Sequence, residues 1–196
     1  MKQTELFQEW LGMKNPYEKH STPFSIEMQE ELEEFYLERY CMWFSQGLFG
    51  MANSMIPMIN MWDDHDIIDG FGSYPHHFMS TPVFSGLGAI AFKYYMLFQH
   101  QSVPTETHVD EPSWLLGAER GPYINQLSRS VFTSLGRHVA FLALDCRMER
   151  MRDSILSQGS YDLIFDRLRR EIIEGETKHL IVLLGVVRMH SRSYMN

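Results

Sequence analysis

The chain has 196 residues, of which 44% are hydrophobic and 13% aromatic, so it can bury one sizeable core and general disorder is disfavoured. The formal net charge is −8 at pH 7, which argues against duplex nucleic acid as the main partner because phosphate neutralisation needs a clustered basic surface. No run approaches the ~20 apolar residues of a membrane helix, the N-terminus has no signal peptide, and the 2 cysteines lie far apart, which together predict a cytoplasmic protein.

The first predicted element is a long helix. Between residues 24 and 42, apolar side chains recur at steps of three and four residues, and the acidic side chains lie mostly off that stripe. Thr22 is the predicted N-cap with Pro23 at the first helical position. The helix is predicted to end at Gly47 and Gly50.

The middle of the chain alternates between apolar runs and polar loops. The run "SMIPMINMW" (54–62) predicts a buried strand that ends in a loop, with Pro57 near its start because proline cannot donate to a central ladder. A second helix is predicted to begin at Thr81 and Pro82. Residues 101–122 contain three prolines and are interpreted as a long surface loop.

The last third predicts a hairpin, a helix and a strand. Residues 128–135 and 138–145 are the hairpin strands, a helix follows around 161–175, and 178–187 is the final strand. The alternation of strands and helices predicts an α/β fold, with ligands at the carboxyl ends of the strands. Under that rule, Asp145 would share one rim with the aspartates that follow residue 62.

The segment "WDDHDIIDGFGS" is rich in acidic residues, and two interpretations remain open. Its aspartates could accept hydrogen bonds from backbone amides in a turn. Alternatively, Asp63, Asp64 and His65 could bind a cation, since paired carboxylates and an imidazole suit a divalent or trivalent ion. Negative charges this close together also need a counter-charge. A cation would keep Asp64 ionised and leave His65 free for proton transfer. Gly70 and Gly72 could aim amides at a phosphate or simply permit positive φ.

The segment "INMWDDHDIIDGFGSYP" closely resembles the Asp-Asp-His segment of PhoD-like metallophosphatases, in particular the fungal proteins with this domain. The similarity continues through "GLGAIAFKYYMLFQHQ", "RSVFTSLGRHVAFLALDCRMERM" and "KHLIVLLGV", and covers about Phe35 to Val186. The resemblance implies an α/β sandwich, with helices flanking a mixed sheet, around a dinuclear metal centre that hydrolyses phosphate esters. The metals would be divalent or ferric ions, with iron and calcium, manganese or zinc as candidates.

The resemblance also implies roles for individual residues. In the family, a water or hydroxide held by the metals attacks phosphorus in line. On that basis Asp64 is a metal ligand, Asp63 is a ligand or orients one, and His65 orients the phosphate or protonates the leaving group. Arg147, in the family's Asp-x-Arg pattern, could contact the transferred phosphoryl group or simply pair with Asp145 or a neighbouring glutamate.

Two departures from the family pattern lead to the expectation of a partial domain. Residues 1–60 lack the family's Gly-Asp loop, whose aspartate bridges both metals, and Val187 stands where the family has proline. The predicted organisation is an N-terminal segment (1–20), a partial PhoD-like phosphatase domain (21–186) and an atypical tail (187–196). Besides a phosphoesterase whose activity is doubtful, a non-catalytic interaction module that retains the fold stays open. Unpaired sheet edges predict poor solubility.

Overall fold

The computed structural model describes residues 4–185, so the predicted tail (187–196) lies outside the described residues. The helices are α1 (Glu5–Gly12), α2 (Pro16–Ser21), α3 (Ile26–Ser45), α4 (Gly47–Asn53), α5 (His76–Met79), α6 (Pro82–Gln99) and α7 (Gln158–Leu168). A 3₁₀ turn, η1 (Asp64–Asp66), and a π-helical turn, η2 (Arg169–Ile173), complete the helical elements. The strands are β1 (Trp114–Arg120), β2 (Leu127–Ser134), β3 (Val139–Leu144) and β4 (His179–Leu184). None of the described helices is both long enough and apolar enough to cross a membrane.

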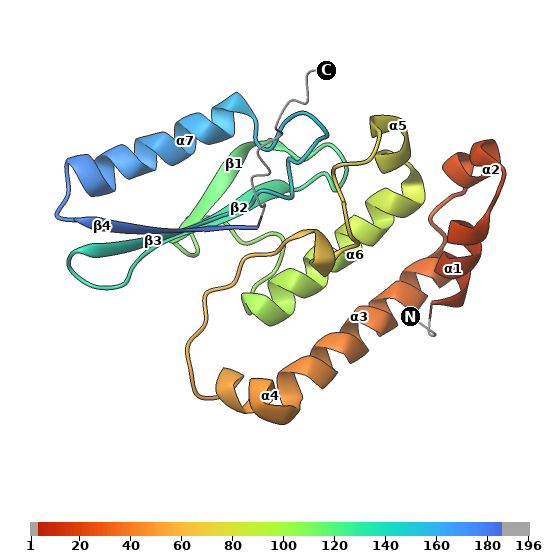
Figure 1. The fold of residues 1–196 in the computed structure, drawn as a ribbon, viewed down its shortest axis with the longest axis horizontal. Coiled ribbons are helices and arrows are strands. Elements are labelled where there is room, and N and C mark those ends of the chain that lie inside the picture. Colours follow the sequence, from red (N-terminus) through yellow and green to blue (C-terminus); the bar gives the residue numbers. More distant parts are fainter. Residues whose placement is uncertain (1–3, 186–196) are drawn as a thin grey trace, which may run out of the picture.

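The strands form one 4-stranded mixed sheet in the order β1-β2-β3-β4 (Figure 1). The first three strands are antiparallel, and β4 is parallel to β3 after a crossover through α7. Alternate residues of β2 face opposite sides: Phe132 packs with Ile164 of α7, while Val131 belongs to the cluster that contains α6. Helices therefore flank a mixed sheet on both faces, which confirms the predicted α/β fold and the β2–β3 hairpin.

The larger core lies around α6, which is buried on nearly all sides. Helix α3 runs along α6, and the N-terminal helices close the far end of this layer (Figure 1). Trp10 of α1 is 1% exposed, and its ring lies 6.1 Å from Phe78 and 5.5 Å from Phe84. No helix was predicted before residue 22, where the structure has α1 of 8 residues and α2 of 6.

Helix α3 begins later than predicted. The Oγ of Ser25 accepts the backbone N–H of Met28 at 3.2 Å and caps the helix, whereas Thr22 lies at the end of α2 and donates its hydroxyl to the Glu18 carbonyl at 2.7 Å. The predicted N-cap at Thr22 was therefore wrong by three residues. Gly47 does mark the end of α3, with φ +63°, but Gly50 lies inside α4.

Two predictions about the middle of the chain were wrong. Residues 54–62 form a loop rather than a buried strand, and Met55 and Ile56 are 76% and 60% exposed. This apolar run finds no ladder partner in the described part of the chain, and a strand needs one to satisfy its backbone. Conversely, the predicted loop 101–122 contains β1, whose alternation is obscured by Gly117 and a charged end.

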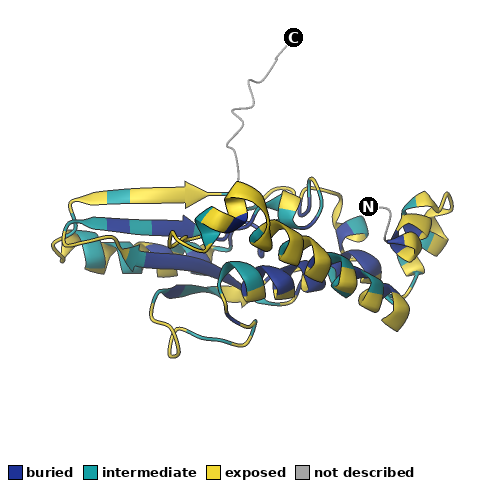
Figure 2. Cartoon of the chain, turned by 90° about the horizontal axis from the view of Figure 1, so that it is seen from below, coloured by how far each residue is buried: buried dark blue, intermediate teal, exposed yellow. Residues whose placement is uncertain are grey.

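Strand β4 is apolar on both faces and yet lies at the edge of the sheet. Ile181, Val182 and Leu184 are 49%, 47% and 52% exposed, and Figure 2 shows the strand as largely exposed beside the buried β3. Strands with two apolar faces are typical of sheet interiors, and a free apolar edge offers unpaired backbone groups to another chain.

We therefore expect the isolated chain to self-associate through β4. Replacing Ile181 and Leu183 together with lysine should shift the chain toward monomer in size-exclusion chromatography with light scattering, because charge opposes edge-to-edge pairing. Lysine at two exposed apolar positions elsewhere, Leu135 and Leu163, serves as the control. A wild-type chain that is monomeric and melts cooperatively would contradict this expectation.

A second expectation concerns His100, which is packed between Tyr95 and Trp114. Burial, together with the nearby Arg129 charge, lowers the pKa of His100 from 6.5 to about 4. The folded chain keeps this imidazole neutral while the unfolded chain protonates it, so the contribution of His100 to stability is present above pH 6.5 and is lost as the pH falls toward 4. The total loss should reach about 3 kcal/mol.

Urea denaturation at pH 7 and pH 5 measures this effect. At pH 7, His100→Gln should have a lower free energy of unfolding than wild type, but that free energy should change less between pH 7 and pH 5. The exposed His108→Gln should keep the wild-type change between the two pH values. An identical slope in wild type and His100→Gln would show that the imidazole is already solvated in the folded chain.

Candidate functional site

The acidic segment folds into η1 through contacts between its own side chains and backbone. The carboxylate of Asp63 accepts the His65 backbone N–H at 2.8 Å, and the carboxylate of Asp66 accepts the Asp63 backbone N–H at 2.8 Å. These reciprocal bonds form a capping box, with aspartate in both of its positions. The turn interpretation is therefore correct for part of the cluster, because two of its carboxylates satisfy local amides.

Trp62 ties this turn to the sheet. Its side chain is fully buried, its ring stacks on Tyr95 at 4.9 Å, and its Nε1–H donates to a carboxylate oxygen of Asp145 at 2.7 Å. Asp145 directly follows β3, so one hydrogen bond fixes the start of the acidic segment against the end of a central strand.

Asp145 has a supporting position rather than one on the open rim. It is 0% exposed and accepts three further hydrogen bonds, from the backbone N–H groups of Arg129, Arg147 and Met148 at 2.8–3.1 Å. Burial raises the pKa of Asp145, and these donors act against that rise. Asp145 therefore lies at the end of β3 beside the acidic segment, as predicted, but its carboxylate faces inward to Trp62.

Arg147 joins the end of β3 to the acidic segment. Its Nη2 donates to the Asp64 carboxylate at 3.1 Å and to the Gly185 carbonyl at 2.9 Å, and its Nη1 lies 3.4 Å from the Phe71 carbonyl. Arg147 is 6% exposed, and its Nε is buried without a partner among the described residues. The ion pair is made with Asp64, and neither Asp145 nor a neighbouring glutamate takes that place.

Asp64 is held as a carboxylate by these neighbours. One oxygen faces Arg147 and the other accepts the Gly70 backbone N–H at 2.8 Å. Burial alone would raise the pKa of Asp64, but the Gly70 hydrogen bond and the Arg147 charge outweigh it, so the pKa lies below the ordinary value. Arg147 therefore supplies much of the counter-charge that the acidic sequence requires. The Gly70 amide, a candidate phosphate donor from the sequence, donates to Asp64 instead.

His65 lies among carboxylates at the surface of the turn. Its side chain is 74% exposed, with Nδ1 at 3.5 Å from Asp63 and 3.7 Å from Asp64, and Nε2 at 3.6 Å from Asp69. Asp69 was not among the predicted site residues. Its four-residue spacing from His65 is the signal in the sequence that could have indicated the contact between these two side chains.

Asp63, Asp64 and His65 offer ligand atoms that all lie within 4.8 Å of one another. Two carboxylates and an imidazole are a donor set that fits a divalent or ferric cation. Within residues 4–185 this is the one such group.

Comparison with known proteins identifies a family and one relative. A family model described as PhoD related phosphatase matches residues 1–195. The chain is 40% identical over 198 aligned positions to the uncharacterized protein YGR266W of Saccharomyces cerevisiae, an alignment that covers 90% of this chain and 28% of the yeast protein. The chain thus spans little more than a quarter of the length of this relative. No solved structure matches the chain.

Proposed function

The chain belongs to the PhoD-related phosphatase family, and we propose that it hydrolyses phosphate esters at the site formed by Asp63, Asp64, His65 and Arg147. The observation that carries this proposal is the contact between Arg147 and Asp64 across 83 residues of sequence. It brings a guanidinium, two carboxylates and an imidazole to one place, and these are the groups that phosphoryl transfer requires.

Arg147 is the proposed phosphoryl-binding group. Asp64 and the Gly185 carbonyl hold its guanidinium in a fixed orientation, so no side-chain entropy is lost when substrate arrives. Its positive charge stabilises the negative charge that builds up on the phosphoryl oxygens in the transition state.

His65 is the proposed proton donor to the leaving-group oxygen. Its ring is largely exposed and therefore accessible to substrate, and the carboxylates of Asp63, Asp64 and Asp69 surround its two nitrogens. These carboxylates orient the imidazole.

Asp63 and Asp64 would hold the metal ion. Their oxygens lie close enough together to share one cation, and Asp64 is already held in its ionised form. A divalent or ferric ion supplies Lewis acidity, which polarises phosphoryl oxygens and lowers the pKa of water.

Turnover of glycerol phosphate and of p-nitrophenyl phosphate tests the proposal. With Mn²⁺ present, His65→Ala should lower kcat for glycerol phosphate by about 10²–10⁴-fold, the usual contribution of a general acid, and should lower kcat for p-nitrophenyl phosphate by less, because p-nitrophenolate leaves without a proton. The exposed His108→Ala is the matched control and should keep wild-type activity. Equal activity in wild type and His65→Ala would remove His65 from the mechanism, and no turnover with any divalent or ferric ion would contradict the proposed function.

One observation favours the second candidate, a non-catalytic interaction module that retains the fold. Both oxygens of Asp64 already have partners in Arg147 and Gly70, so this carboxylate is balanced without a cation. Such a module would show no protein-linked metal binding, which separates it from the enzyme.

A further inference from the structure

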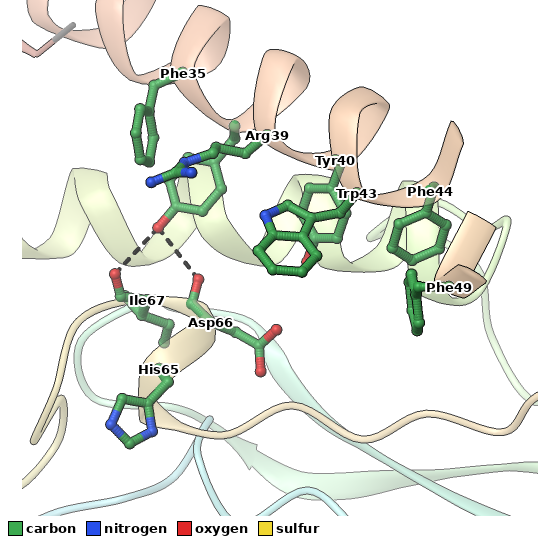
Figure 3. A pocket seen from close by; sticks show the side chains of 10 residues that line it. Phe35, Arg39, Tyr40, Trp43, Phe44, Phe49, His65, Asp66 and Ile67 are labelled. Carbon is green, nitrogen blue, oxygen red and sulfur yellow. Dashed lines mark hydrogen bonds between the residues drawn. The ribbon is translucent and has the colours of Figure 1, made fainter. Parts of the chain in front are cut away.

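A pocket with a volume of about 400 Å³ lies between α3 and η1. Its lining is dominated by aromatic side chains from α3 and α4, with one guanidinium: Phe35, Arg39, Tyr40, Trp43, Phe44 and Phe49. Figure 3 shows Phe35, Arg39 and Trp43 on the side of α3 that faces η1, and Phe44 and Phe49 beside each other at the α4 end. Trp43 and Phe49 are 59% and 44% exposed, and aromatic surface left in contact with water in a concave site is typical of ligand binding.

The pocket shares η1 with the phosphatase site. Asp66 and His65 form its lower wall, and the His65 ring extends from that wall away from α3 (Figure 3). The ring nitrogens of His65 lie 3.5–3.7 Å from the carboxylates of Asp63, Asp64 and Asp69. A ligand that rests on η1 can therefore place one end among the aromatic rings and the other beside His65.

Hydrogen bonds hold the two walls of the pocket in a fixed relation. The Tyr36 hydroxyl lies 3.2 Å from the backbone carbonyls of both Asp66 and Ile67. The Gln99 side-chain amide donates to the Tyr40 hydroxyl and to the Asp66 carboxylate, both at 2.9 Å. The same Asp66 carboxylate caps the Asp63 amide, so the wall of the pocket and the acidic turn form one connected structure.

The chemistry of the lining selects a flat ring over an alkyl chain. Arg39 lies over the Phe35 ring at 5.4 Å and forms no ion pair with another described residue, so a cation and several π-faces point into the same space. Aromatic faces and a guanidinium plane both stack on planar rings, whereas an acyl chain would desolvate the Arg39 charge without offering it a partner.

We propose that this pocket binds the aromatic ring of a phosphate monoester whose phosphoryl group lies beside His65. The substrate class is an aryl phosphate or a nucleoside monophosphate. The position of the phosphoryl group rests on the proposed function, but the affinity of the pocket for a ring does not.

Paired substrates test the assignment in the full chain. Trp43→Ala should lower kcat/KM for p-nitrophenyl phosphate by about 10-fold, the scale of one lost stacking contact, and should leave kcat/KM for glycerol phosphate within about 2-fold. Trp43→Phe keeps a ring and should restore most of the loss. Leu37→Ala changes an exposed α3 residue outside the pocket and is the control. Equal losses for both substrates, or no loss for either, would overturn the proposal.

A phosphate-free probe separates the pocket from catalysis. In calorimetric titration, adenosine should bind saturably to wild type and Trp43→Phe, and the binding should be lost in Trp43→Ala. If no ester is hydrolysed but adenosine binds in this pattern, the proposed function fails and the pocket stands. If esters are hydrolysed and adenosine binds equally in wild type and Trp43→Ala, or not at all, the pocket assignment fails and the hydrolase stands.

Discussion

Replacement of Arg147 with alanine is expected to lower the turnover of p-nitrophenyl phosphate by about 10²–10³-fold, the cost of removing one preorganised donor that stabilises transition-state charge. The guanidinium is buried and fixed by Asp64 and Gly185, so no neighbouring side chain can replace it. Its removal also leaves Asp64 without its counter-charge. Steady-state kinetics at saturating metal give kcat and KM separately, and the loss should fall mainly on kcat because the proposed contact strengthens in the transition state.

Two further variants make this result specific to the guanidinium. Arg147→Lys keeps the charge but lacks the planar fork, and should recover only part of the activity. Arg152→Ala removes an exposed arginine from the same loop and should behave as wild type. If Arg147→Ala retained wild-type kcat, Arg147 would be a structural residue that only holds Asp64 in place.

Replacement of Asp145 with alanine is expected to destabilise the chain by about 3–5 kcal/mol. The substitution leaves four buried donors without an acceptor: the Trp62 indole and the backbone N–H groups of Arg129, Arg147 and Met148. Each buried donor that loses its partner costs about 1–3 kcal/mol, and local relaxation recovers part of the sum. Urea denaturation monitored by circular dichroism measures the change.

Asp145→Asn is the matched comparison, because its amide oxygen keeps one acceptor site in the same position. It should lose less stability than the alanine variant. A loss below about 1 kcal/mol in Asp145→Ala would mean that these donors find other partners and that Trp62 does not depend on Asp145 for its position.

The parts of the fold that the sequence predicts are those with local signals. The β2–β3 hairpin, helix α6 and strand β4 show runs and turn residues that need no distant partner to be recognised. The segment 54–62 is apolar like a strand, but only a neighbouring strand can make it one, and periodicity does not reveal whether a neighbour exists. β1 was missed for the opposite reason, since its pairing with β2 overrides a weak local pattern.

The candidate site shows the same division. Asp63, Asp64 and His65 could be identified from one short segment, and Arg147 through the Asp-x-Arg pattern of the resemblance. What the sequence leaves open is which carboxylate pairs with Arg147, because Asp64 is 83 positions away while Asp145 is only two. The fold decides it, since the four hydrogen bonds to Asp145 occupy its carboxylate and leave the guanidinium free to reach Asp64.

Calorimetric titration of Mn²⁺ into the chain tests most directly whether the acidic turn is a cation site. We expect one saturable site per chain, with at least about 10-fold weaker binding in Asp63→Asn and Asp64→Asn, because each substitution keeps the side-chain shape but removes a charged ligand oxygen. Asp162→Asn, an exposed aspartate on α7, should bind as wild type does. Absence of a saturable site, or equal binding in all four proteins, would contradict the account.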